Sequence, residues 1–253
     1  MPSIPVDVLR EILEYVDKND LATLCRVNKI CCSCSQDVLY RVIHTDNILV
    51  IRTLAQSTDL AKRVRSFNIP HDGPGLNTAL RNMSSLRRFN IRRINNISIL
   101  DGCTFKLDTI SCDSRYSNSL EQFLNNQPSL TNVTLYASTE PPPFSMSGLP
   151  NLTRVAAEHS WLRILIPGRP VTDVDMIEFW PMDTIDLSYF TLSTAPIHSL
   201  KIPYDYIYLM PKSHLVSIFP SIADLVLAAH DWGLSVRPAY CHRCTDGEVN
   251  YLS

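Results

Sequence analysis

Glycine is scarce in this sequence, which has 7 glycines and 17 prolines among its 253 residues. Most of the prolines lie between apolar runs, so we expect many short elements. No apolar run is close to the length of about 20 residues that a membrane-spanning helix needs. The N-terminus also lacks the charged-then-apolar layout of a secretory signal. We therefore expect a protein of the cytoplasm or nucleus whose eight cysteines are reduced.

An excess of one charge sign is also missing, since 23 basic side chains stand against 25 acidic ones for a net charge of −2. A dedicated nucleic-acid binder would normally be basic. We therefore expect neither nucleic acid nor a membrane as a partner. Hydrophobic residues make up 45% of the chain and charged residues 19%, which is typical of a folded protein.

Catalytic motifs are absent as well. The sequence has no G-x-S-x-G elbow, no glycine-rich phosphate loop and no H-E-x-x-H motif. Cys241 and Cys244 have the C-x-x-C spacing of half a zinc site, but no second pair lies nearby. A metal half-site stays open there beside the favoured interpretation, a C-terminal tail. We expect no enzyme activity, no cofactor and no metal.

The apolar pattern of residues 4–44 predicts three short helices. Pro5 suits the first turn, because proline lacks the N–H that would be unsatisfied there. The second helix is expected to be capped by Asn19 or Asp20. The apolar positions of the three helices are, in order, Leu9, Ile12, Leu13 and Val16; Leu21, Leu24, Val27 and Ile30; and Val38, Leu39, Val42 and Ile43.

These helices cannot bury all of their apolar side chains among themselves. A unit of about 40 residues seldom forms a self-sufficient core without a metal, a disulfide or a partner. Ile4, Val6 and Val8 also fall beside the main apolar stripes. A partner is therefore implied. One alternative is that the helices pack on the rest of the chain. Another is a helix-turn-helix protein that reads DNA, although the helix that would serve as its recognition helix lacks a basic face.

The same segment resembles the F-box family. The residues that carry the resemblance are Ile4-Pro5, Asp7, Leu9 with Ile12 and Leu13, Asp20-Leu21, Leu24 to Val27, and Leu39-Tyr40. Ile4 stands where the family usually has leucine, and Cys31-Cys32-Ser33-Cys34 where it more often has basic and aromatic residues. The resemblance implies binding to the Skp-type adaptor of a cullin-based ubiquitin ligase. The adaptor contacts that it implies are Ile4, Pro5, Leu9, Ile12, Leu13, Leu21, Leu24 and Val27.

A pattern of about 22 residues repeats along the rest of the chain. Its core is a triplet, apolar-x-x-apolar-x-apolar, and successive triplets begin 19 to 26 residues apart. Such a repeat indicates a strand plus a helix or turn per unit, stacked into a right-handed solenoid with a parallel sheet. The triplets are Val64/Phe67/Ile69, Leu86/Phe89/Ile91, Leu107/Ile110/Cys112, Leu130/Val133/Leu135, Leu152/Val155/Ala157, Val171/Val174/Met176, Ile197/Leu200/Ile202 and Ile222/Leu225/Leu227.

The repeats resemble leucine-rich repeats in a degenerate form, of the kind that often follows the F-box in fungal F-box proteins. The usual Asn or Cys after the last apolar position is mostly missing. The resemblance implies an α/β protein, in which a three-helix F-box precedes an irregular leucine-rich-repeat solenoid with a parallel sheet. Its expected parts are the F-box at 1–45, a helical linker at 46–59, the solenoid at 60–230 and a C-terminal tail at 231–253.

The residues that alternate with the triplets should lie on the outer face of the sheet, and they are nearly all polar. Arg88 and Arg92 make the early part of this face basic, while Asp173 and Asp175 make a later part acidic. An acidic or phosphorylated target segment could pair with the arginines; the alternative is a charged face that only keeps the sheet soluble. The predicted target contacts are Arg88, Asn90, Arg92, Asn132, Thr134, Tyr136, Arg154 and Glu158.

These patterns predict the substrate-receptor subunit of a Skp–cullin–F-box ubiquitin ligase. The F-box would dock on the adaptor, and the repeats would hold an unknown target close to a charged ubiquitin-conjugating enzyme. The gain would be effective concentration rather than bond chemistry. The alternative function is a repeat scaffold for protein interaction with no ligase role. An exposed apolar surface on residues 4–27 favours the receptor, and a covered one favours the scaffold.

Overall fold

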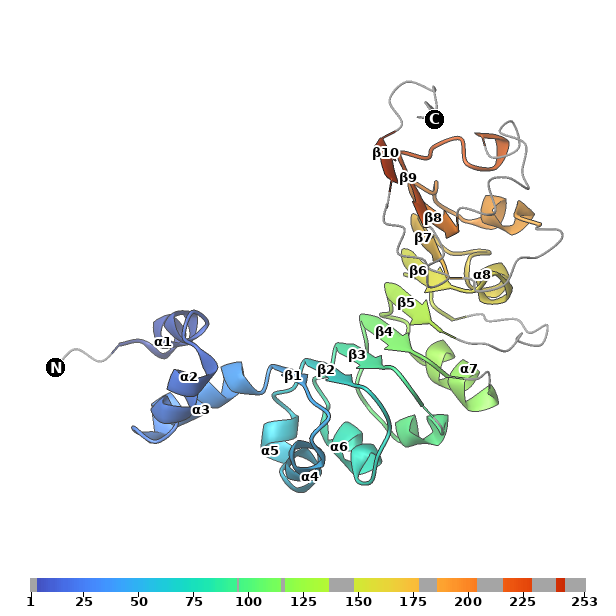
Figure 1. Ribbon diagram of the computed structural model, residues 1–253. Helices are drawn as coiled ribbons and strands as arrows, with labels where there is room; N and C mark the ends of the chain where they lie inside the picture. Colours follow the sequence, from blue (N-terminus) through green and yellow to red (C-terminus); the bar gives the residue numbers. More distant parts are fainter. Residues whose placement is uncertain are drawn as a thin grey trace, which may run out of the picture. The chain divides into compact units, whose positions relative to one another are not determined.

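In the computed structural model, the chain divides into two compact units. We call Met1–Leu107 unit 1 and Asp108–Ser253 unit 2, and describe each by itself (Figure 1). The described residues are 4–94, 96–114, 117–136, 148–177, 186–203 and 216–228, and the backbone of 240–243. Among them, no helix combines the length and the apolarity that crossing a membrane requires.

Unit 1 begins with the three predicted helices. The second helix is capped by Asp17, whose side chain accepts hydrogen bonds from the N–H groups of Asn19 and Asp20. The prediction of Asn19 or Asp20 as the cap was wrong, because the cap is an extended residue ahead of the first turn and these two lie inside that turn. The helices are α1 (Val6–Leu13), α2 (Lys18–Leu24) and α3 (Lys29–Leu39).

The three helices share a small core of their own. Leu13, Leu21 and Cys34 are each 2% exposed, and half-buried side chains of all three helices pack against them. Each buried leucine contributes about 1.5–3 kcal/mol, so this core is modest. The packing side chains are Leu9, Val16, Leu24, Val38 and Leu39.

The first strand follows directly after α3. Val42–His44 forms strand β1, which pairs in parallel with β2, and Ile43 lies opposite Phe67. The predicted third helix therefore ends earlier than expected, before Val42 and Ile43. In unit 1 the remaining strands are β2 (Ser66–Ile69) and β3 (Arg88–Ile91), and the helices are α4 (Ile48–Gln56), α5 (Thr58–Ala61), α6 (Leu76–Asn82) and the 3₁₀ helix η1 (Ile97–Leu100).

The segment predicted as a helical linker, 46–59, belongs to the repeat region. Its helix α4 packs against α6, and Ile51 and Leu54 of α4 are buried. Figure 1 shows α4, α5 and α6 together on one side of the strands of unit 1. Strand β1 also adds to the parallel sheet ahead of the predicted start of the solenoid at residue 60.

Unit 2 continues the same plan of strand and helix. Its described strands run parallel to their neighbours from β4 to β9, and β10 is antiparallel to β9. Strand β10 lies in the segment predicted as a tail. The strands are β4 (Thr109–Cys112), β5 (Asn132–Leu135), β6 (Arg154–Ala157), β7 (Asp173–Met176), β8 (Ser199–Pro203), β9 (Asp224–Ala228) and β10 (Tyr240–Arg243). The helices are α7 (Asn118–Asn125), α8 (His159–Leu165) and the 3₁₀ helix η2 (Ser188–Leu192).

The apolar triplets form the core, as predicted. In the first seven triplets every side chain is at most 6% exposed, whereas the eighth, from Ile222 to Leu227, is half-buried. The strand pairings keep this register from one repeat to the next, because Val133 lies opposite both Ile110 and Val155. The α/β fold class with N-terminal helices and parallel strands is therefore confirmed.

Two cysteines of the repeat region should react slowly with alkylating reagents. Burial raises the pKa of Cys103 to about 11 and that of Cys112 to about 12, from an ordinary 9.0. Alkylation needs the thiolate, so below pH 9 each unit of upward shift lowers its fraction about tenfold. We expect Cys103 at pH about 8 to be alkylated about 100-fold more slowly than in denaturant. Mass spectrometry after iodoacetamide treatment measures this rate, and equal rates would contradict the burial of this thiol.

Candidate functional site

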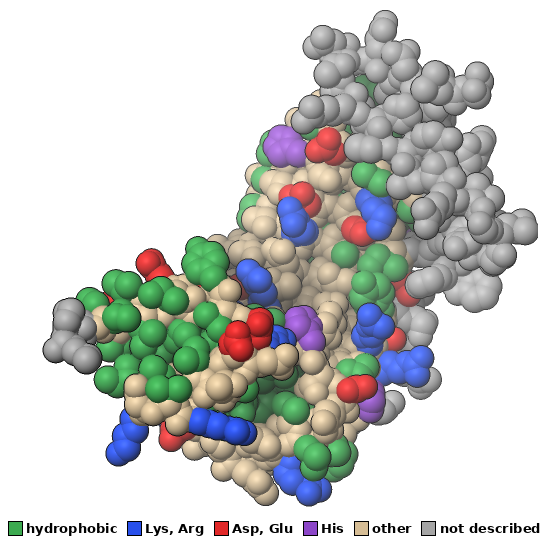
Figure 2. All heavy atoms as spheres, turned by 60° about the vertical axis from the view of Figure 1, so that its left-hand side comes forward, with side chains coloured by type: hydrophobic (Ala, Val, Ile, Leu, Met, Phe, Trp, Pro, Cys, Tyr) green, Lys and Arg blue, Asp and Glu red, His purple; other side chains and the backbone are tan. Residues whose placement is uncertain are grey.

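The N-terminal helices carry apolar side chains that nothing in unit 1 covers. Ile12 is 48% exposed and Val27 is 62% exposed. Val8 and Ile12 are four residues apart in α1 and so lie on one side of it, and Ile4 precedes the helix. Figure 2 shows hydrophobic side chains gathered over these helices. We call this set the apolar face: Ile4, Val6, Val8, Ile12, Val27 and Ile30.

The predicted adaptor contacts divide between this face and the core. Leu13 and Leu21 lie in the helical core and present almost no surface to a partner. For Leu13 this follows from helical spacing, because Leu9 and Leu13 are four residues apart on the side of α1 that packs in the core. The exposed members are Ile4, Pro5, Ile12 and Val27, and the half-buried members are Leu9 and Leu24.

Val8 and Ile30 belong to the apolar face although they were not among the predicted contacts. Val8 is 46% exposed and Ile30 is 56% exposed. The step of four from Ile4 to Val8 to Ile12 was the signal that could have identified Val8. Ile30 was placed on the second helix, but it lies in the first turn of α3.

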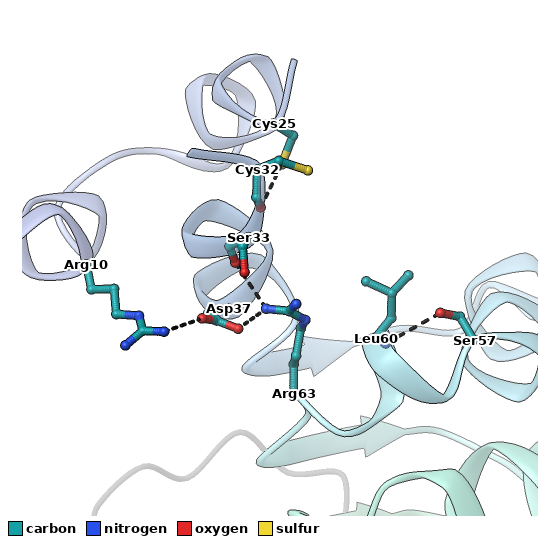
Figure 3. A network of polar contacts seen from close by, with 8 residues as sticks. All are labelled: Arg10, Cys25, Cys32, Ser33, Asp37, Ser57, Leu60 and Arg63. Carbon is teal, nitrogen blue, oxygen red and sulfur yellow. Dashed lines mark hydrogen bonds and ion pairs between the residues drawn. The ribbon is translucent and has the colours of Figure 1, made fainter. Parts of the chain in front are cut away.

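A polar network connects the helices to the first repeat. The carboxylate of Asp37 in α3 accepts from Arg10 in α1 at 3.5 Å and from Arg63, which lies just before β2 (Figure 3). Arg63 also donates to the carbonyl of Ser33 at 3.0 Å. Exposed ion pairs contribute only about 0–1 kcal/mol each, so this network orients the helices more than it stabilises them.

The cysteine-rich stretch lies beside a surface hollow of about 330 Å³. The thiol of Cys25 lies 3.9 Å from the carbonyl oxygen of Cys32 (Figure 3), and burial followed by the proximity of Cys32 raises its pKa. Cys34 is a core residue, as expected of a small apolar filler. Within the described residues, no group of three or more His, Cys, Asp or Glu could hold a metal ion. The side chains of Cys241 and Cys244 lie outside the described residues.

The predicted target contacts of unit 1 lie on the outer face of β3. Arg88 and Arg92 are exposed and Asn90, between them, is half-buried. The strand register places Asn90 beside Asn68 of β2, which in turn lies beside His44 of β1. This part of the sheet therefore presents amides, an imidazole and two guanidinium groups.

The predicted target contacts of unit 2 lie on β5 and β6 and just after them. Tyr136 is 44% exposed, and the other four are exposed or half-buried. Burial, and then the negative charge of Asp113, raise the pKa of Glu158. The register brings Asn132 beside Arg154. The five residues are Asn132, Thr134, Tyr136, Arg154 and Glu158.

The acidic part predicted further along the sheet is paired with basic neighbours. Arg154 of β6 lies 3.4 Å from Asp173 of β7, and Lys201 of β8 lies 2.9 Å from Asp175 of β7. Both carboxylates of β7 thus have a cation on an adjacent strand. The acidic part of the sheet in unit 2 is therefore paired within that unit.

Comparison with protein families identifies the N-terminal helices. Residues 1–42 match the family model of the F-box domain. The chain carries an F-box domain. The F-box match ends where β1 begins, so it leaves the repeats unassigned, and no curated protein matches the chain. An F-box implies binding of a Skp-type adaptor and a role in substrate recognition by a ubiquitin ligase, and F-box proteins are typically non-catalytic.

Proposed function

We propose that this F-box protein is the substrate receptor of a Skp–cullin–F-box ubiquitin ligase, acting in the cytoplasm or nucleus. The F-box docks on the Skp-type adaptor, the adaptor connects it to the cullin, and the repeat region holds a target protein. A charged ubiquitin-conjugating enzyme then meets a lysine of the target at high effective concentration. The receptor contributes position and no bond chemistry.

The exposure of the apolar face carries this proposal. A scaffold without a ligase role would cover the apolar side chains of residues 4–27 with its own repeats, yet Ile4 is 59% exposed and Val27 is 62% exposed. Side chains such as these favour burial by about 25 cal/mol per Å² of apolar surface, so they mark a place where another protein binds. The F-box match at residues 1–42 supports a Skp-type adaptor as that protein.

The repeat region has the features of a degenerate leucine-rich-repeat solenoid. Triplets recur at near-constant spacing and fill the core beside the parallel strands. In such an array the outer face of the sheet is the surface that stays polar and accessible, and we assign target binding to it. The residues of this surface are Arg88, Asn90 and Arg92 in unit 1, and Asn132, Thr134, Tyr136, Arg154 and Glu158 in unit 2.

Binding of the purified full chain to the Skp-type adaptor tests the proposal. We expect one-to-one binding, and a loss of at least about 100-fold in affinity for the double variant Ile12→Asp, Val27→Asp. Each aspartate would place an unpaired charge in an apolar interface, which costs roughly 1–3 kcal/mol or more. Isothermal titration calorimetry measures both affinities.

Leu49→Asp is the matched control. Leu49 lies in α4, also in unit 1, and is 59% exposed, close to the exposure of Val27, but it is not part of the apolar face. We expect this variant to bind the adaptor as the unmodified chain does. A well-folded chain that fails to bind the adaptor, or a double variant no weaker than Leu49→Asp, would leave the scaffold function standing instead.

A further inference from the structure

Arg88 in β3 and Arg92 just after it have no ionic partner among the described residues, unlike two cations of unit 2. In unit 2, Arg154 and Lys201 each pair with a carboxylate of β7. Arg88 and Arg92 in unit 1 are exposed, and no ion pair joins either of them to another described residue. These basic side chains thus differ in whether a carboxylate pairs with them, and composition does not reveal that difference. The guanidinium groups of β3 remain available for an anion from outside the chain.

The surroundings of these arginines favour hydrogen-bond acceptors. Asn90 lies between them in the sequence. Across the sheet, Asn90 of β3 lies beside Asn68 of β2, and Asn68 lies beside His44 of β1. The amides can donate to an approaching carboxylate. Asp46 is exposed and follows β1. Strand β1 is two strands away from β3, or about 10 Å, and Asp46 forms no ion pair with Arg88 or Arg92. Asp72 lies nearer, since its N–H donates to the carbonyl of Arg93 at 3.2 Å, but no ion pair joins a described carboxylate to Arg88 or Arg92.

The spacing of the two arginines selects between kinds of anion. Arg88 begins β3, and Arg92 follows its last residue, Ile91, at a bend; the N–H of Arg92 still donates to the carbonyl of Ile69 at 3.3 Å, so the backbone is extended up to that point. Four residues of strand span about 13 Å. That span separates the two backbone positions, so one phosphate group would contact both guanidiniums only if both side chains turned toward each other. Two carboxylates on an extended segment, also four residues apart, match it.

We propose that the outer face of β3 binds an extended acidic segment of the target protein, with two carboxylate side chains four residues apart. One carboxylate pairs with Arg88 and the other with Arg92, and the residue midway between them lies over Asn90. Because β3 is already paired with β2, the segment binds through its side chains on the face of the sheet rather than as an added strand. This inference names the target chemistry of the proposed receptor function and rests on that function for its biological meaning.

Fluorescence anisotropy with labelled peptides and the full chain tests the spacing. Three short peptides in a background of Ser, Thr and Val serve as probes: one with two glutamates four residues apart, one with two adjacent glutamates, and one with a single phosphoserine. We expect the first peptide to bind most tightly. We expect Arg88→Gln and Arg92→Gln each to weaken it about tenfold and the double variant about 100-fold, because each removes one charge-assisted pair.

Lys201→Gln is the matched control, since Lys201 lies on β8 in unit 2, outside the assigned target contacts, and already pairs with Asp175. We expect it to leave the affinity unchanged. The proposal is overturned if no glutamate peptide binds, if the phosphoserine peptide or the adjacent-glutamate peptide binds as tightly, or if Lys201→Gln weakens binding as much as the variants of Arg88 and Arg92. Adaptor binding is measured separately, so loss of peptide binding with the adaptor still bound contradicts this inference and leaves the ligase role intact.

Discussion

Leu13→Ala is expected to unfold the F-box helices, while the neighbouring substitution Ile12→Ala leaves them folded. Leu13 is 2% exposed at the centre of the small helical core, and Ile12 lies on the apolar face at 48% exposure. Removing a buried leucine side chain costs about 2–5 kcal/mol. A unit of about 40 residues rarely has more than about 3–5 kcal/mol of stability to lose. One core substitution therefore suffices to unfold it.

Hydrogen exchange followed by mass spectrometry separates the two variants. In Leu13→Ala we expect the amides of α1 to α3 to lose protection and those of β5 to β7 in unit 2 to keep it. In Ile12→Ala we expect protection throughout, together with weaker adaptor binding. Full protection of α1 in the Leu13 variant would show that the helices draw their stability from elsewhere. The pair also separates loss of an interface from loss of a fold, which adaptor binding alone cannot do.

The strands of the repeats could be predicted because their signal is local. An apolar-x-x-apolar-x-apolar triplet fixes both the position of a strand and its inward face, as in Leu130, Val133 and Leu135, each at most 1% exposed. The period of two then assigns the outward residues, such as Asn132 and Thr134. Nothing about distant neighbours is needed, so the sequence alone identified the core of these repeats and the polar face of the sheet.

The first repeat escaped prediction because its triplet is incomplete. Ile43 lies opposite Phe67, so the corresponding positions around it are Tyr40 and the polar Thr45. A threonine in the third position removes the pattern. The helical character of 48–56 was visible in the sequence, but helical spacing does not say what a helix packs on. Segment 46–59 was therefore assigned to a linker, although α4 packs against α6.

The candidate site was predicted in outline, and its details depend on contacts between distant residues. Amphipathic spacing identified the apolar stripes of α1, but it does not say which stripe meets α3 and which meets a partner. Leu13 was therefore grouped with Ile12 although they face opposite ways. Likewise, Asp173 becomes neutralised only because the register brings Arg154 within 3.4 Å of it. Register between strands follows from the whole array and not from either segment.

Arg169 is expected to be the charged residue whose loss most destabilises unit 2. It is 4% exposed, and burial lowers the pKa of its guanidinium, which nonetheless stays charged. Its Nη1 atom donates to the carbonyls of Ile164 at 2.8 Å and Leu165 at 3.1 Å, at the end of α8. Its Nε atom donates to the carbonyl of Gly148 at 3.0 Å. The side chain thus satisfies carbonyls that a helix end leaves unpaired and ties α8 to a neighbouring segment.

Arg169→Met keeps most of the side-chain volume but removes every donor. We expect the free energy of unfolding of unit 2 to fall by about 3 kcal/mol or more, because several buried carbonyls lose their partner at once. Arg163→Met is the control, since Arg163 lies in the last turn of the same helix with its side chain exposed, and should cost less than about 1 kcal/mol. Urea denaturation followed by circular dichroism measures both. Equal costs for the two variants would mean that water, rather than Arg169, satisfies the end of α8.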